Sequence, residues 1–264
     1  MGRTCFIKSI KMFRLFITAL SALLLLSSCS VHEEINLSEE GKGYYKMSVD
    51  MSQAIEMMKG MGGKEQIPDS VANKILDSSF SMNAQIDSIE MNFTDTEKKF
   101  FYKGKMHIQM NMKENKMKME LKYPVTNAKE LQQFFAVYAK VDSVSKLKQK
   151  ENPDVNKGPT EMPISPDLFS SLPANNKPYI ITDTSIERIV VSKEDLKKQM
   201  EDMQGGEMFM SQMSYAITIV LPRPVKRIEG KNVKLQDDKK TVLISLSFAD
   251  MMSNPEEGKF KIVF

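Results

Sequence analysis

A strict alternation of apolar and polar side chains between Phe100 and Tyr123 limits the folds open to this chain more than any other feature. One parity is apolar and contains Phe100, Tyr102, Met106, Ile108, Met110 and Met112. The other parity is polar and contains Lys103, Lys105, His107, Gln109 and Asn111. After the polar turn at 113–116, the apolar parity continues with Met117, Met119, Leu121 and Tyr123. A period of two predicts an antiparallel hairpin with one buried face and one wet face.

The remaining patterns predict further strands together with several helices. Residues 31–37 and 44–51 alternate around a glycine-containing turn, which is typical of a second hairpin. Apolar residues at helical spacing predict helices at 52–61, 68–76, 127–148 and 192–203. Short apolar runs predict strands at 179–182, 186–191, 215–221, 225–228, 233–236, 241–248 and 260–264. We therefore expect an α+β fold, mainly an antiparallel sheet of hairpins with helices packed on one face.

The chain divides into four parts by composition. Residues 1–28 resemble a signal peptide, and residues 29–148 form an N-terminal α+β part. Residues 149–178 contain six prolines and predict a long loop or linker. Residues 179–264 form a strand-rich C-terminal part of the same domain.

The N-terminus resembles the lipobox of exported bacterial lipoproteins. Basic residues Lys8, Lys11 and Arg14 precede the apolar run 15–26, which is too short to cross a bilayer comfortably. The last residue of this run begins the sequence Leu26-Ser27-Ser28-Cys29. The resemblance implies cleavage after Ser28 and acylation of Cys29, for example by palmitate, which would anchor the chain in the cell envelope facing the periplasm or the surface. The alternative is a chance cysteine at the end of a core helix.

The lipobox resemblance also favours the outer membrane, because Ser30 is not the aspartate that retains many such proteins in the inner membrane.

The residue counts of the chain after cleavage limit the chemistry that it can perform. Apart from Cys29 the mature chain has no cysteine, which excludes disulfides, thiolate zinc sites and a thiol nucleophile. Removal of residues 1–28 leaves 33 basic against 34 acidic side chains. This balance gives no general attraction to nucleic acid.

Two ends of the chain also resemble the LppM-like bacterial lipoprotein domain. The C-terminal likeness covers Tyr215–Pro222, Val225, Gly230, Val233 and Lys240–Ser245. The N-terminal likeness is a lipidated cysteine followed by two strands around Gly41 and Gly43. The resemblance implies an α+β envelope domain, with lipid binding suggested for some members.

No catalytic residue, cofactor or metal ligand is predicted. The mature chain has only His32 and His107, and it contains no hydrolase, zincin or nucleotide-binding motif. Met106, Met110, Met112, Met117 and Met119 could suggest a Cu(I) site of thioethers. However, His107 has the opposite parity, so we interpret the methionines as core.

We therefore predict a lipid-anchored envelope protein with a non-catalytic structural or interaction role, presenting a loop or an edge strand to another envelope protein. The alternative is the binding of a lipid or another apolar ligand, because methionine repacks around irregular shapes. In that case the pocket would be lined by Met106, Ile108, Met110, Met112, Met117, Met119 and Leu121. A hydrolase or a Cu(I)-binding protein is a more remote possibility.

Overall fold

The fold is known from a computed structural model of the full chain. It describes residues 30–60, 73–82, 93–151, 179–189, 194 and 213–264. Ser28, Cys29 and the greater part of both the predicted loop at 149–178 and the predicted helix at 192–203 lie outside these ranges.

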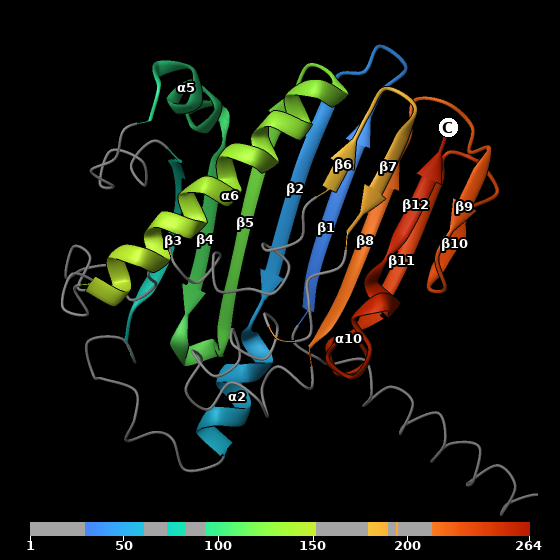
Figure 1. The fold of residues 1–264 in the computed structure, drawn as a ribbon. Helices are drawn as coiled ribbons and strands as arrows, with labels where there is room; N and C mark the ends of the chain where they lie inside the picture. Colours follow the sequence, from blue (N-terminus) through green and yellow to red (C-terminus); the bar gives the residue numbers. More distant parts are fainter. Residues whose placement is uncertain (1–29, 61–72, 83–92, 152–178, 190–193, 195–212) are drawn as a thin grey trace, which may run out of the picture.

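An eight-stranded sheet forms the body of the protein (Figure 1). All neighbouring strands are antiparallel except β1 and β8, which are parallel. The spatial order is β10 (Val233–Leu235), β11 (Thr241–Ser247), β8 (Ser214–Val220), β1 (Ser30–Leu37), β2 (Gly43–Asp50), β5 (Lys116–Val125), β4 (Lys105–Asn111) and β3 (Ile75–Ser81). The first and last thirds of the chain therefore meet at the centre of one sheet.

One face of this sheet is covered by a helix and a second sheet (Figure 1). Helix α6 (Ala128–Glu151) crosses this face on the side of β5 and β4. Its aromatic residue Phe134 stacks on Tyr123 of β5, with ring centroids 4.0 Å apart. The second sheet covers the side of β1 and β8, in the order β6 (Tyr179–Ile181), β7 (Ser185–Arg188), β12 (Phe260–Val263) and β9 (Arg227–Glu229). The predicted α+β class with mainly antiparallel strands is confirmed.

Shorter elements lie at the ends of the strands. They are α2 (Ser52–Gly60), α5 (Asp95–Lys103), η2 (Met112–Glu114), α10 (Phe248–Ser253) and η3 (Pro255–Gly258).

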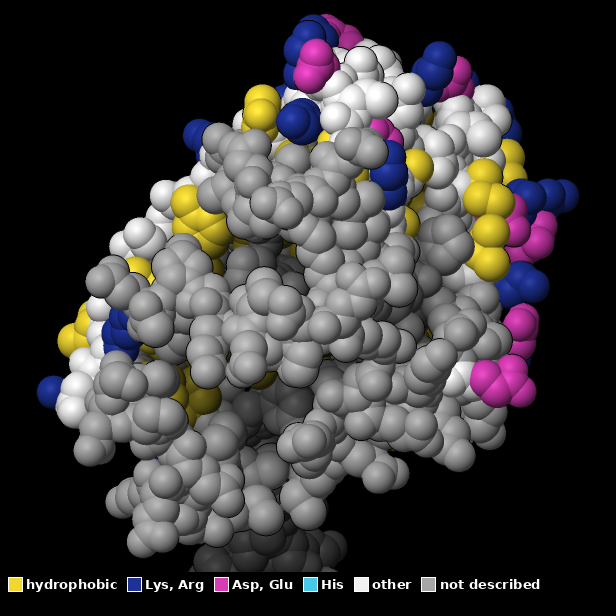
Figure 2. Space-filling view, turned by 60° about the vertical axis from the view of Figure 1, so that its left-hand side comes forward, with side chains coloured by type: hydrophobic (Ala, Val, Ile, Leu, Met, Phe, Trp, Pro, Cys, Tyr) yellow, Lys and Arg dark blue, Asp and Glu magenta, His cyan; other side chains and the backbone are white. Residues whose placement is uncertain are grey.

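Among the described residues, no helix is long and apolar enough to span a membrane. In a view with the left-hand side of Figure 1 turned forward, acidic and basic side chains are interspersed along the described margin (Figure 2).

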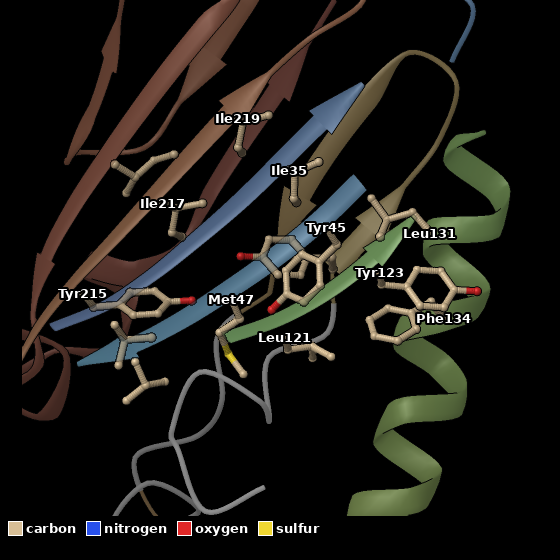
Figure 3. Close-up of a cluster of buried hydrophobic side chains, with 14 of the residues drawn as sticks. Ile35, Tyr45, Met47, Leu121, Tyr123, Leu131, Phe134, Tyr215, Ile217 and Ile219 are labelled. Carbon is tan, nitrogen blue, oxygen red and sulfur yellow. The ribbon is translucent and has the colours of Figure 1, made fainter. Parts of the chain in front are cut away.

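The core lies between the layers, and its side chains come from alternate positions of the strands. Figure 3 shows side chains of β1, β2, β5 and β8 pointing to the same side of the sheet, where Leu131 and Phe134 of α6 lie. Ile35, Met47, Ile219 and Leu131 are completely buried. The buried parity of β1, β2 and β5 is the one that the sequence predicted.

The turn between β1 and β2 depends on glycine at two positions. Gly41 has a φ of +78°, which favours glycine, and its N–H donates to Ser38 O. A Cβ on Gly43 would lie only 1.7 Å from the backbone oxygen of Asn36. These two contacts explain the tight predicted hairpin.

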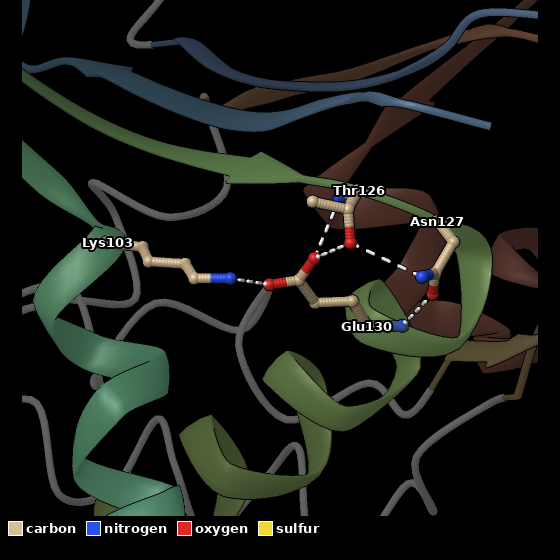
Figure 4. Close-up of polar contacts among 4 residues, drawn as sticks. All are labelled: Lys103, Thr126, Asn127 and Glu130. Atoms are coloured by element: carbon tan, nitrogen blue, oxygen red, sulfur yellow. Dashed lines mark hydrogen bonds and ion pairs between the residues drawn. The ribbon is translucent and has the colours of Figure 1, made fainter. Parts of the chain in front are cut away.

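Polar side chains fix the start of α6 (Figure 4). Asn127 Oδ1 accepts a hydrogen bond from Glu130 N at 2.8 Å, which caps the helix. Glu130 in turn accepts from Thr126 N at 2.7 Å and pairs with Lys103 at the end of α5. The predicted helix at 127–148 is therefore confirmed, with an end three residues later.

Two predicted elements are wrong. Phe100 and Tyr102 belong to helix α5 instead of the long hairpin, because Thr94 and Glu97 form a capping box and Gly104 ends the helix before β4 begins. Ile75 and Leu76 begin strand β3 instead of ending a helix, because this segment pairs with β4 from Ile75↔Asn111 to Ser81↔Lys105. The sequence pattern also did not predict α10 or η3.

Candidate functional site

The predicted pocket-lining residues are part of the core. Met117 is half-buried, and the other six are between 2% and 5% exposed: Met106, Ile108, Met110, Met112, Met119 and Leu121. They belong to the same buried cluster as Phe101 of α5 and Phe134 of α6. Their burial agrees with the interpretation of the methionines as core filler.

His107 lies on the opposite face of the sheet from these thioethers. Its Nε2 lies 2.7 Å from Asp77 Oδ1, and Gln109 donates to the other oxygen of Asp77 at 2.9 Å. The parity argument against a histidine-assisted Cu(I) site therefore agrees with the geometry. Within the described ranges, no group of three or more His, Cys, Asp or Glu side chains is arranged to hold a metal ion.

The open face of the eight-stranded sheet contains a shallow hollow of about 340 Å³. Its lining comes from β1, β2, β4 and β5 and is mainly polar: Ser30, His32, Ser48, Val49, Asp50, His107, Gln109, Lys118, Met119 and Glu120. His32, Ser48, Glu120 and His107 are successive cross-strand neighbours in one row.

The charges of this hollow are largely matched within the protein. Lys118 pairs with Asp50 at 2.7 Å, and His32 lies 3.0 Å from Thr218 Oγ1. Strands are spaced about 4.8 Å apart, so three strand steps place His32 about 14 Å from His107. That separation is too large for the two rings to act on one metal ion or one proton. The hollow can offer hydrogen bonds to a polar partner.

A second polar group is buried between the two sheets, and the sequence analysis missed it. Glu33 of β1 is 1% exposed, and Arg188 of β7 is completely buried. The hydroxyl of Tyr179 donates a hydrogen bond to the Glu33 carboxylate. The guanidinium carbon Cζ of Arg188 lies 4.8 Å from the ring centroid of Tyr215. Nη1 of Arg188 donates a hydrogen bond to Gly258 O at 3.0 Å. The group, which we call the interlayer cluster, consists of Glu33, Tyr45, Tyr179, Arg188 and Tyr215.

Electrostatics keep the tyrosines of the interlayer cluster protonated. Burial raises the pKa of Tyr45, Tyr179 and Tyr215 well above 10, and the charge of Glu33 raises it further. Burial alone would lower the pKa of Arg188, but the acidic groups around it outweigh burial and raise that pKa. At neutral pH the cluster therefore holds a charged guanidinium among neutral phenols.

The interlayer cluster is sealed from solvent, since none of its five side chains is more than 4% exposed. A substrate could not reach these groups without opening the two sheets, so their arrangement fits structural support better than chemistry. Nε and Nη2 of Arg188 have no hydrogen-bond partner in the described part of the chain. Burial of donors without a hydrogen-bond partner costs free energy, so Arg188 is energetically unfavourable at this position.

A signal for the interlayer cluster was present in the sequence. Glu33 alternates with Val31, Ile35 and Leu37, the apolar parity of β1. Arg188 likewise shares the buried parity of Ile186 in β7. A charged residue in an apolar row indicates a buried charge, and a buried charge requires a partner.

The edge of β3 is the remaining candidate. Within the described ranges β3 pairs with β4 alone, so its other edge presents unpaired backbone groups. Ile75 is 67% exposed, the largest exposure of any large hydrophobic side chain in the described part. The seven residues ILDSSFS contain no lysine, proline or glycine.

Comparison with known proteins identifies no relative. No family model matches the sequence, and neither a curated protein nor a solved structure matches it.

Proposed function

We propose that this chain is a lipid-anchored protein of the cell envelope, held in the outer membrane through Cys29, with a non-catalytic interaction role. Its binding surface is the free edge of β3, to which another envelope protein adds an extended strand. Such strand addition gives affinity through main-chain hydrogen bonds. The observation that carries the proposal is the length of this edge, which has seven residues and contains no lysine or proline.

The other three sheet edges in the described part are protected. Strands β10, β6 and β9 are three residues long each. Strand β6 is tied to α6, because Ile181 N donates to Gln132 Oε1 at 2.6 Å. Strand β9 carries the charged pair Arg227–Glu229, and β10 carries Lys234. Short strands and lysines are the usual means of preventing unwanted pairing, so their absence from β3 favours a partner there.

The polar hollow adds to this surface. Asp77 of β3 contacts both His107 and Gln109, which also line the hollow. A partner seated on β3 could therefore reach side chains of the open face as well as the strand backbone. The edge would provide affinity and the mixed charges of the open face would provide selectivity.

Site-specific photocrosslinking in cells tests the proposal. A photoreactive amino acid at Ser79, in the middle of the edge, should form a discrete adduct with one envelope protein. The variant Ser79→Lys, with the probe moved to Ile75, should lose that adduct, because an edge lysine blocks strand addition. Ser245→Lys, at an exposed position of the interior strand β11, is the matched control and should keep it.

Three results would change the conclusion. An adduct that persists in Ser79→Lys would overturn the edge as the binding surface. Adducts between two copies of the chain alone would replace the partner protein by self-association. Co-purified acyl lipid that is lost in Met119→Phe would support the alternative of an apolar ligand.

The anchor is tested separately. Labelling with a fatty acid should mark the wild type, and Cys29→Ser should remain unlabelled. Equal labelling of both proteins would overturn acylation of Cys29.

A further inference from the structure

The position of β1 fixes how the domain faces its membrane. Ser30, which follows the proposed anchor residue Cys29 directly, is already the first residue of β1. Consecutive Cα atoms lie about 3.8 Å apart, so no linker separates the lipid from the sheet. Ser30 pairs with Asp50 of β2 on one side and with Ser214 of β8 on the other. The anchor would therefore hold the sheet at the end of a central strand.

We infer that the end of the molecule where β1 begins lies against the lipid headgroups, and this inference rests on the proposed acylation of Cys29. Two elements flank this point on the side of β2 and β5: α2 and the η2 turn between β4 and β5 (Figure 1). Asp50, the partner of Ser30, accepts from Ser52 N at the start of α2 at 3.0 Å. We call the surface formed by α2 and η2 the anchor-side surface.

The anchor-side surface is internally braced. Lys59 near the end of α2 donates to the backbone oxygen of Met112 and to Asn115 Oδ1, both in the η2 turn. Met117 N donates to Ser52 Oγ at 3.2 Å, which ties β5 to the start of the helix. Because α2 and η2 are fastened to each other and to the sheet, they would keep a defined height above the bilayer.

The charge on this surface is mixed, because Glu56 of α2 and Glu114 of η2 are exposed as well as Lys113. Lys113 of η2 is exposed, and no ion pair of its side chain is found among the described residues. Lys59 keeps its ammonium group between α2 and η2. A lysine held near an anionic surface is attracted to it, so Lys113 would add to the lipid anchor, whereas the two glutamates would oppose it. The orientation therefore rests on the position of the anchor at the start of β1.

The opposite end of the same two strands provides an internal reference. Glu40 lies in the β1–β2 turn, and its side chain is 74% exposed. The eight residues of β1 span about 27 Å at the usual rise per residue. Residues 40 and 113 should therefore differ in their distance from the bilayer by more than the thickness of a headgroup layer.

Fluorescence quenching of the full lipidated protein tests this orientation. Cys29 is the only cysteine of the mature chain and its thiol would be blocked by lipid, so an added cysteine can be labelled specifically. Lys113→Cys and Glu40→Cys are labelled with the same fluorophore and reconstituted in vesicles of phosphatidylethanolamine and phosphatidylglycerol. A fraction of the lipid carries a nitroxide quencher on its headgroup.

We expect at least threefold stronger quenching at position 113 than at position 40. Flotation of the vesicles is measured first. Protein that does not float with the vesicles would overturn the anchor and this orientation together. Protein that floats but shows equal quenching at both positions, or stronger quenching at position 40, would overturn the orientation alone.

Discussion

At the scale of single residues, the least ordinary feature is the burial of two side chains of opposite charge type in the interior, Glu33 and Arg188. Glu33 and Arg188 belong to different sheets and interact electrostatically across the core. The removal of one of two buried opposite charges leaves the other charge uncompensated. The two sheets are linked here by the hydrogen bond that Tyr179 of β6 donates to Glu33 of β1.

This reasoning predicts an asymmetry between single and double substitutions. Arg188→Met should reduce the free energy of unfolding by about 3–5 kcal/mol, because Glu33 then remains buried without its cation. Adding Glu33→Gln to that variant should recover part of the loss, which urea unfolding of all four proteins would measure. Strictly additive losses would show that the two charges act independently.

Glu130 gives a second prediction at this scale, concerning pH. Burial alone would raise its pKa, but hydrogen bonds from Lys103 and Thr126 outweigh burial and lower it below the usual 4.5. A lowered folded-state pKa stabilises the protein above pH 4.5, and this contribution is lost as the pH falls through the folded value. Glu130→Gln should therefore cost about 1–2 kcal/mol at pH 7 and much less at pH 3.

The exposed residue Glu114 provides the control for this measurement. Glu114→Gln should leave the free energy of unfolding within about 0.5 kcal/mol of the wild type at both pH values. A loss for Glu130→Gln that is as large at pH 3 as at pH 7 would contradict the electrostatic explanation.

At the scale of elements, the β4–β5 hairpin makes the two faces of the sheet directly comparable. Met110 is 2% exposed on the core face, whereas Lys105 is exposed on the open face of the same strand. Met110→Asp should cost at least 3 kcal/mol, because it buries a carboxylate without a partner. Lys105→Asp should cost less than about 1 kcal/mol. Similar losses in urea unfolding would contradict the assignment of the two faces.

The elements also show what the sequence could predict and why. Period-two alternation identified β1, β2, β4 and β5 with their buried parity, because every second side chain of a half-buried strand faces the core. It failed at Phe100 and Tyr102, where two residues of matching parity continued the strand pattern into α5. The capping box of Thr94 and Glu97 was the signal that should have taken precedence.

The candidate sites were less predictable than the elements. The core position of the predicted methionines followed from local pattern, and the structure agrees with it. The interlayer cluster required the pairing of Glu33 with residues about 150 positions away, such as Tyr179. The free edge of β3 follows from strand order, which depends on the whole topology. The alternation in β1 and β7 indicates buried charges, but neither the partners of Glu33 nor the strand order can be derived from a short stretch of sequence.

At the scale of the whole molecule, the N-terminal and C-terminal parts share one core. Strand β8 lies between β1 and β11, and it is parallel to β1 along its full length. Phe135 of α6 also contacts Tyr179 of β6, with ring centroids 5.0 Å apart. The parts before and after residues 149–178 therefore complete each other's layers instead of forming separate units.

Cleavage between the two parts tests this interdependence. Limited proteolysis should cut first between Lys150 and Lys177, in the proline-rich segment, to give two fragments on a denaturing gel. The nicked protein should nevertheless elute from a sizing column as one particle, because β8 stays paired with β1. Ile217→Asp, which places a charge at a position 1% exposed in β8, should let the fragments separate after the same cut. Separation of the wild-type fragments under native conditions would mean that each part holds its own core, contrary to the shared sheet.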